Sequence, residues 1–350
     1  MAYSAISKPS LHFNTKIYTG NGSTNALTGV GFQPDFVWLK RRDASAGHKL
    51  NDAVRGVNKQ LVSNNTNAQN TDTNVLTAFG TDGFTLGNNS DVNNGSGTFV
   101  SWNWKAGTTG SGTTTGSGTG KAYTYTVSTD AGFSIIKYQG NGSGGHTIPH
   151  HLGATPGFII IKNLDSNTDW RCFHKSIPSA NTRAIRLNSD DYWNTDSSWW
   201  NNTSPGSTVF TVGSSTSMNG NNTNYIAYCF TSVNGFSIID GYTGNDSTNG
   251  TFVYTGFKPG FVLIKRQNAS DPWYIYDDKR TGFNPKNSSL YPNQSAAEDA
   301  NDKINLLSNG FKLTIANNDV NGNGDKYIYM AMAAEPLVAN VGEGLPTAAR

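Results

Sequence analysis

Charged residues are scarce in this sequence. Aspartate, glutamate, lysine and arginine make up 14% of its 350 residues, whereas about 25% is usual in soluble domains. The formal net charge is +2, and the only concentrated basic run is Lys40-Arg41-Arg42. Nucleic-acid-binding domains carry basic stripes or patches, so we expect no nucleic-acid partner.

Glutamate is nearly missing, with Glu298, Glu335 and Glu343 the three examples. Glycosidase chemistry requires two carboxylates that face one cleft. Adjacent pairs such as Asp190 and Asp191 would point to opposite faces of a strand. The sequence also lacks the Gly-x-Ser-x-Gly and His-Glu-x-x-His motifs of hydrolases. We therefore expect a protein that is not an enzyme.

Cysteine and long apolar runs are rare as well. Cys172 and Cys229 each fall within a predicted strand, which indicates buried thiols and no disulfide framework. No run approaches the roughly 18 apolar residues that a membrane span needs. Residues 1–13 lack the basic flank and apolar stretch of a signal peptide. We expect no membrane insertion, and synthesis in a cytoplasm that the chain leaves only on a larger particle.

The residues that replace the missing ones favour β-structure. The chain holds 39 Gly, 15 Tyr, 17 Phe and 8 Trp, together with many Asn, Ser and Thr. Turn formers combined with aromatic and β-branched residues are typical of all-β proteins. Helix should be minor, and the best candidate for a helix is residues 293–303.

Four landmarks recur three times in the same order. They are a Tyr-x-Gly-Asn turn, a strand that follows Gly-x-x-Pro, a later short strand, and an aromatic strand that closes the unit. The turns lie at 18–21, 138–141 and 242–245, the Pro-led strands at 31–40, 153–162 and 256–265, the short strands at 82–87, 208–213 and 309–314, and the closing strands at 99–107, 225–233 and 327–335. The sequence therefore encodes three homologous modules.

Each module reads as a β-sandwich. Gly and Asn tolerate positive φ and suit the Tyr-x-Gly-Asn turn, and proline marks the start of a strand. Residues 158–161 are apolar without alternation, which favours a strand buried between two layers. Many short strands separated by turn residues are typical of sandwiches.

The module boundaries follow from these landmarks. We predict module 1 over residues 1–107, a flexible Gly/Ser/Thr linker over 108–121, module 2 over 122–234, and module 3 with a C-terminal tail over 235–350. Because almost no linker separates modules 2 and 3, these two should pack together. Module 1 should be more independent.

The chain resembles a family of bacteriophage virion proteins found in marine phages, notably those that infect cyanobacteria. The resemblance covers nearly the whole chain apart from the linker and the last residues. Its matching stretches are IPHHLGATPGFIIIKN (148–163), residues 225–266, LSNGFKLT (307–314) and KYIYMAMAAEPLV (326–338), with YTGNGSTNALTGVGFQPDFVWLKRRD (18–43) and SWNWKAG (101–107) similar to a companion form. Members resemble concanavalin-like or jelly-roll-like sandwiches.

The resemblance implies a tail-fibre or fibre-like appendage subunit involved in attachment to the host surface, located in the virion after assembly in the host cytoplasm. Its partners would be other virion proteins, further copies of the chain, most often as a trimer, and a host surface glycan. Two other functions stay open, a capsid decoration or connector protein without a ligand and a polysaccharide-degrading enzyme. The resemblance supplies no cofactor and no catalytic residues.

One candidate binding site lies in the variable part of module 2. Residues 188–202 place three tryptophans among Asn, Asp and Ser. Sugar rings stack on exposed aromatic rings while Asn and Asp bind hydroxyls. The predicted carbohydrate site comprises Trp193, Trp199, Trp200, Asp190 and Asp191. The competing interpretation is that these rings cover the module's own core or an interface.

Two metal-like patterns have plainer interpretations. His146, His150 and His151 would need a fourth ligand such as His174, yet the equivalent stretches of modules 1 and 3 hold no histidine. Residues 319–325, DVNGNGD, begin like an EF-hand loop whose twelfth position is not a carboxylate. A structural turn in the first case and an Asn-Gly hairpin in the second explain both, so we predict no metal site.

Overall fold

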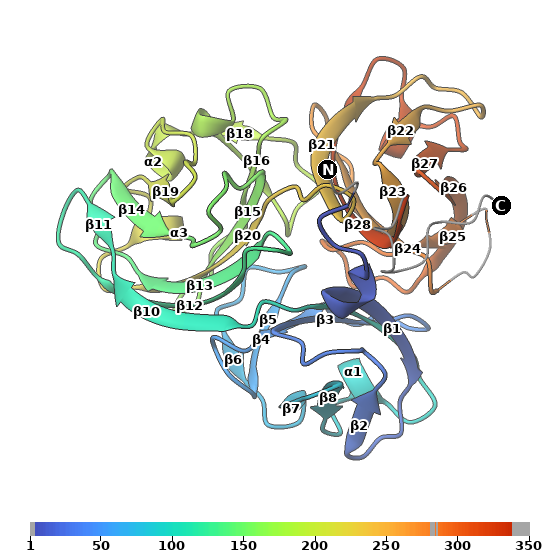
Figure 1. The fold of residues 1–350 in the computed structure, drawn as a ribbon, viewed down its shortest axis with the longest axis horizontal. Coiled ribbons are helices and arrows are strands. Elements are labelled where there is room, and N and C mark those ends of the chain that lie inside the picture. Colours follow the sequence, from blue (N-terminus) through green and yellow to red (C-terminus); the bar gives the residue numbers. More distant parts are fainter. Residues whose placement is uncertain (1–3, 281–283, 285, 338–350) are drawn as a thin grey trace.

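The chain forms three β-sandwich modules that surround one centre as three lobes (Figure 1). This computed structural model describes residues 4–280, 284 and 286–337. The predicted C-terminal tail from 338 onward lies outside the described residues. The predicted all-β class is confirmed, because the described α-helices are single turns among many antiparallel strands. None of these helices is long and apolar enough to cross a membrane.

The elements divide among the modules as follows. Module 1 contains η1 (Pro9–Leu11), β1 (Phe13–Thr19), β2 (Asn25–Thr28), β3 (Phe36–Arg41), β4 (Lys49–Asp52), β5 (Lys59–Val62), β6 (Asn70–Thr71), β7 (Leu76–Gly80), β8 (Gly83–Leu86), α1 (Ser90–Asn93) and β9 (Thr98–Trp104). Module 2 contains β10 (Thr108–Thr113), β11 (Thr115–Gly116), β12 (Ala122–Ser128), β13 (Phe133–Gln139), β14 (His146–Pro149), β15 (Phe158–Asn163), β16 (Arg171–His174), η2 (Ala180–Thr182), β17 (Arg183–Arg186), β18 (Asn194–Thr195), α2 (Ser197–Trp200), β19 (Val209–Val212), α3 (Thr216–Asn219) and β20 (Asn224–Phe230). Module 3 contains β21 (Ser237–Thr243), β22 (Phe252–Tyr254), β23 (Phe257–Arg266), β24 (Trp273–Asp277), β25 (Lys286–Ser289), β26 (Asp299–Leu307), β27 (Gly310–Leu313), α4 (Asn318–Asn321) and β28 (Lys326–Pro336).

The large sheets of the three modules share one strand order. It is β1-β9-β3-β4 in module 1, β13-β20-β15-β16 in module 2 and β21-β28-β23-β24 in module 3. A second sheet completes each sandwich, with orders β2-β8-β7, β11-β14-β19 and β22-β27-β26-β25; it is the smaller of the two in modules 1 and 2, whereas both sheets of module 3 have four strands. The threefold sequence repeat is therefore a threefold structural repeat.

The central strand of each large sheet is buried on both faces, as its apolar run predicts. Every residue of β15 is buried. Ile159 and Ile161 lie in the sandwich core of module 2, whereas Phe158 and Ile160 lie in a core shared with modules 1 and 3. Burial on two faces thus requires the neighbouring modules.

The Tyr-x-Gly-Asn turn is held by a buried asparagine on a one-turn helix. In module 3 the Tyr242 hydroxyl donates to Val320 O at 2.6 Å, and the Asn245 N–H donates to Asn321 Oδ1 at 3.1 Å. The Asn321 amide donates in turn to Ser247 O at 2.9 Å. The same bonds join Tyr18 with Val92 and Asn21 with Asn93, and Tyr138 with Met218 and Asn141 with Asn219.

The glycine of this turn is required by close backbone approach. A Cβ on Gly20, Gly140 or Gly244 would lie 2.1, 2.4 or 2.3 Å from a backbone oxygen of the segment that follows the one-turn helix. Such distances are far inside van der Waals contact, so only glycine fits. The motif therefore fastens the two ends of each module together.

The prediction of a flexible linker over residues 108–121 is wrong for the larger part of this segment. Residues 108–113 form β10, an edge strand paired with β12, with Gly110 opposite Tyr125 and Gly112 opposite Tyr123. An added Cβ would lie 2.6 Å from the Tyr125 ring and 2.7 Å from the Tyr123 hydroxyl. The tyrosine rings therefore cover the glycines and supply the packing that glycine lacks.

Two further expectations are corrected. Residues 293–303 form no helix. Their second half belongs to β26, which pairs with β27 and buries Ile304 and Leu306 on alternate positions. Module 1 is not independent, because Phe36 and Trp104 lie in the same core cluster as Phe261 of module 3. The large sheets need this shared contact, so all three modules pack together.

Gly110→Val distinguishes a paired strand from a linker. The added side chain displaces the Tyr125 ring, which stacks on His151 with 3.7 Å between ring centroids, so we expect a loss of about 1–2 kcal/mol in the free energy of unfolding. Urea denaturation measures this loss. Ser111→Val on the opposite face of β10 is the control and should be nearly neutral. Equal stability of the two variants would contradict the strand.

Candidate functional site

Two of the three tryptophans in the predicted carbohydrate site are core residues. Trp199 is 6% exposed and Trp200 is fully buried. The Trp200 indole N–H donates to Arg183 O at 2.9 Å, and the Arg171 guanidinium lies 4.4 Å from the centroid of the Trp199 ring. Neither ring is available to a sugar, so the prediction is wrong for both.

The other predicted residues are also engaged within the chain. The Arg183 guanidinium lies 3.6 Å from the centroid of the half-buried Trp193 ring. Asp190 accepts from Asn293 of module 3, and Asp191 pairs with Arg186 at 3.0 Å. The two carboxylates remain exposed, but the rings on which a sugar would stack pack against the core.

The histidines of module 2 bond to protein groups in separate places. His146 is buried, with Nδ1 2.9 Å from Asn219 Oδ1 and Nε2 2.6 Å from Thr114 Oγ1. His150 Nε2 donates to Gly206 O at 3.1 Å, and burial lowers the pKa of His150 to about 4. Within the described residues, no cluster of His, Cys, Asp and Glu could hold a metal.

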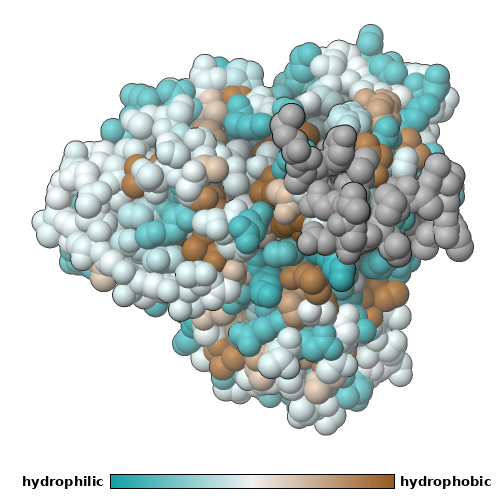
Figure 2. Space-filling view, viewed as in Figure 1, coloured by the Kyte–Doolittle hydropathy of each residue, from teal (hydrophilic) through white to brown (hydrophobic). Residues whose placement is uncertain are grey.

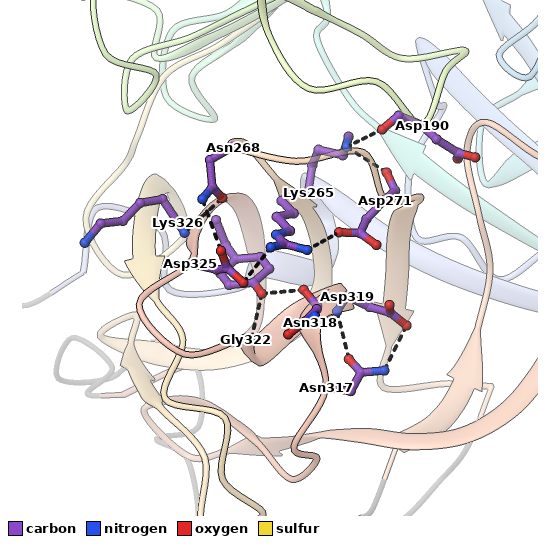
Figure 3. Close-up of polar contacts among 12 residues, drawn as sticks. Asp190, Lys265, Asn268, Asp271, Asn317, Asn318, Asp319, Gly322, Asp325 and Lys326 are labelled. Atoms are coloured by element: carbon purple, nitrogen blue, oxygen red, sulfur yellow. Dashed lines mark hydrogen bonds and ion pairs between the residues drawn. The ribbon is translucent and has the colours of Figure 1, made fainter.

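The EF-hand-like loop 319–325 does not collect its carboxylates (Figure 3). Asp319 accepts from Lys303 at 2.7 Å and from the Tyr274 hydroxyl at 2.8 Å, whereas Asp325 pairs with Arg266 at 2.8 Å. Partial burial alone would raise the pKa of Asp319, but the bonds from Lys303 and Tyr274 outweigh it and hold that pKa below its usual value. Both carboxylates are thus committed to different cationic side chains.

Buried lysines are the most unusual groups of the structure. Lys40, Lys162 and Lys265 lie at equivalent places near the end of the central strand in each module, and none is exposed. Burial lowers the pKa of each lysine to about 8. Buried ammonium groups persist only when hydrogen bonds compensate their lost hydration. The acceptors of these lysines therefore identify what the charges hold together.

Each lysine bonds to a backbone carbonyl of another module. The contacts are those of Lys40 with Ser295 O (3.2 Å), Lys162 with Thr66 O (3.1 Å) and Lys265 with Asp190 O (2.9 Å, Figure 3). Module 1 thus contacts module 3, module 3 contacts module 2, and module 2 contacts module 1. Three copies of one head-to-tail interface close a ring within a single chain.

Indole N–H groups make hydrogen bonds between the same pairs of modules and in the same direction around the ring. The Trp170 N–H of module 2 donates to Val62 O of module 1 at 3.1 Å. The Trp273 N–H of module 3 donates to Arg186 O of module 2 at 2.8 Å. At the corresponding place module 1 has His48, which is buried. Burial lowers the pKa of His48 well below its usual value.

A buried aspartate strengthens two of the three interfaces. Asp52 accepts from Arg55 at 2.5 Å and from the Tyr228 hydroxyl of module 2 at 2.8 Å. The pair is dry, since the Asp52 side chain is 0% and the Arg55 side chain 1% exposed. The equivalent bonds in module 3 join Asp277 with Arg280 (2.6 Å) and with Trp102 of module 1 (3.0 Å).

The third interface replaces this ion pair with a neutral group. Module 2 holds His174 at the equivalent place, and its Nε2 donates to Tyr329 O of module 3 at 3.2 Å. Burial lowers the pKa of His174 to about 4, so the ring is uncharged at neutral pH. The ring of modules is therefore threefold in architecture but not in chemistry.

Aromatic rings from all three modules fill the centre. Phe36 stacks on Tyr228 with 4.5 Å between centroids, and Phe133 stacks on Phe230 at 4.8 Å. Trp104 lies 5.6 Å from Phe261. The rings pack against one another, so the centre is a shared core, and the buried lysines around it join neighbouring modules.

Sequence analysis did not single out these three lysines. A lysine ends each Pro-led strand, at positions 40, 162 and 265, and this recurrence was the available signal. Which carbonyl each lysine reaches depends on a neighbouring module.

Trp200→Ala tests whether this ring belongs to the core. Removal of a fully buried indole should lower the free energy of unfolding by about 3–5 kcal/mol, measured by urea denaturation. Trp193→Ala is the matched control at a half-buried ring and should cost about 1 kcal/mol through the lost contact with Arg183. Trp200→Ala with no greater cost than Trp193→Ala would argue against the core assignment.

The buried lysines predict a stability that rises in mild alkali. The folded pKa of Lys162 is about 8 and its ordinary value is 10.5, so the unfolded state binds more protons between these values. The free energy of unfolding should therefore increase from about pH 8 to 9.5. Lys162→Met should reduce this slope, and should also cost about 1–3 kcal/mol at pH 8 because buried carbonyls lose their donor.

Lys175→Met is the control for the alkaline slope, because Lys175 lies exposed in the same module. Its variant should keep the wild-type slope. Unfolding curves at several pH values provide the measurement, and a wild-type slope in Lys162→Met would refute the assignment.

Comparison with known proteins gives one family. No curated protein and no solved structure matches the sequence. A family described as "Domain of unknown function (DUF7483)" matches residues 8–336. The match runs from before β1 to the end of β28, so the unit of the family is the complete ring of three modules. The chain belongs to this family of unknown function.

Proposed function

We propose that the chain is a structural protein of a phage virion, a subunit of a tail fibre or fibre-like appendage that takes part in attachment to the host surface. The resemblance of the repeated stretches to virion proteins of marine phages is the starting point. The observation that carries the proposal is the closed ring of three modules, in which buried charged side chains form hydrogen bonds between neighbouring modules.

A rigid ring of this kind suits a particle component better than a catalyst. The buried carboxylates Asp52 and Asp277 each serve an arginine and a neighbouring module. Glu298 accepts from Arg42 at 2.9 Å and from Arg280 at 3.1 Å, which ties it to the same interface. Such groups have structural partners, so a polysaccharide-degrading activity has the least support of the alternatives.

The expected homotrimer needs a different contact surface. The head-to-tail interface is already used three times inside one chain, which leaves no free copy of it to join further chains. We propose that assembly with other virion proteins or further copies uses the outer surfaces of the modules.

Labelling of intact virions with an antibody against this chain, followed by electron cryo-microscopy, tests the location. We expect label on the tail or its fibres. Label on the capsid would replace the proposal by the decoration or connector function, and its absence from particles would refute a virion role.

Competition for adsorption tests the attachment role. Purified folded chain should reduce adsorption of phage to host cells in a dose-dependent manner, and heat-unfolded chain is the control. Unchanged adsorption at saturating folded chain would contradict attachment.

A further inference from the structure

Two aromatic side chains of module 3 lie open on the surface. Phe252 and Tyr254 are 46% and 58% exposed. They are two residues apart on β22, so both point to the same side of the strand. β22 is an edge strand of the outer sheet of module 3, in the upper right lobe of Figure 1. Adjacent exposed aromatic rings with polar groups around them are a common feature of ligand-binding surfaces.

The fold itself does not require these rings. Val253 faces Phe311 on the neighbouring strand, as Leu27 faces Phe84 in module 1, which aligns the two strands residue by residue. The residues at the places of Phe252 and Tyr254 are Ala26 and Thr28 in module 1 and Thr147 and Pro149 in module 2. Two modules fold with small or polar residues here, so the aromatic pair is specific to module 3.

A glycine lies beside each ring. A Cβ on Gly310 would lie 3.1 Å from Phe252 Cε2, and a Cβ on Gly256 would lie 3.6 Å from the Tyr254 hydroxyl. Neither position has a side chain that could cover a ring. Each ring therefore lies beside a position without a side chain, and about half of each residue is exposed.

A cation lies next to the aromatic pair. Lys312 is directly opposite Phe252 across the strands, where modules 1 and 2 have Thr85 and Thr211. The ammonium group donates to the neutral Asn249 amide oxygen. Module 3 thus replaces a small or polar pair by an aromatic residue and a positive charge at one place on its surface.

The size of this patch selects the kind of ligand. The other large exposed hydrophobic side chains of the described residues, Leu11, Ile17, Val57 and Tyr192, belong to modules 1 and 2. Apolar residues are likewise scattered on the face seen in Figure 2. A protein partner needs about 800 Å² of surface, whereas a pyranose ring needs only one or two aromatic faces and nearby hydrogen-bonding groups.

We propose that Phe252, Tyr254 and Lys312 form a binding site for an anionic saccharide, whose apolar ring face stacks on the aromatic pair and whose carboxylate or phosphate pairs with the lysine. This site would supply the ligand class for the proposed attachment role and rests on that proposal for its biological setting. The chemistry of the site stands on the residues alone.

A bacterial glycan array that carries lipopolysaccharides and capsular polysaccharides tests the site with purified full-length chain. We expect binding to acidic glycans. The double substitution Phe252→Ala with Tyr254→Thr copies the residues of module 1, and so should fold normally while it weakens binding at least about tenfold, as expected for loss of ~1.4 kcal/mol or more of stacking. Lys312→Thr should weaken the binding of acidic glycans more than the binding of neutral ones.

Tyr192→Ala is the control, because it removes an exposed tyrosine from module 2. Its binding should equal that of the wild type. An array without any bound glycan, or a double variant that binds as tightly as the wild type, would overturn the site. If the array binds no glycan and the double variant binds another virion protein more weakly than the wild type does, the patch is a protein-docking site and the saccharide proposal is overturned.

These outcomes are separate from those of the proposed function. A chain located in the tail fibre with a silent array refutes the saccharide site alone. A chain located in the capsid that binds acidic glycans through Phe252 and Tyr254 refutes the appendage role and leaves the site in place.

Discussion

The central strands of this protein are apolar on both faces, and the rest of the structure depends on covering the second face. One face packs in the sandwich of its own module, while Phe158, Trp104 and Phe261 project from the large sheets into a common centre. Burial of this apolar surface is the main stabilising term. A single module would leave its inner face, the face toward the common centre, in water, and packing of the three modules covers it. The buried lysines then help to fix how they meet, because each ammonium bonds to a carbonyl of the next module as well as to carbonyls of its own.

The repeat and its two-sided strands were predictable from sequence, because they depend on local spacing and hydropathy. The pairing of residues 108–113 was not. Gly and Ser indicate flexibility when read alone, whereas here Tyr123 and Tyr125 of the partner strand cover the glycines. The cyclic order of the modules was equally inaccessible, because a pattern that marks an apolar face does not identify the neighbour that covers it.

The predicted carbohydrate site shows that sequence neighbours also fail to indicate whether an aromatic ring is exposed. Trp199 and Trp200 stand among polar residues in the sequence, yet α2 turns both rings inward and an internal carbonyl receives the Trp200 N–H. Polar neighbours in sequence do not place a ring in solvent. The aromatic residues that do lie in solvent, Phe252 and Tyr254, belong to a short strand with a counterpart in each of the other modules. Only the strand registers show which residues of the counterparts occupy the same places, and these are small or polar.

Closure of the ring also sets an order of events during synthesis. The Lys40–Ser295 bond joins residues 255 positions apart, so the interface between modules 1 and 3 forms only after most of the chain has left the ribosome. Until then the inner faces of the first two modules lack one neighbour, and such uncovered apolar surface favours aggregation. Long-range contacts of this kind slow folding. The emerging chain is therefore most exposed to aggregation just before β28, the last strand of the described residues, joins module 3 to the other two.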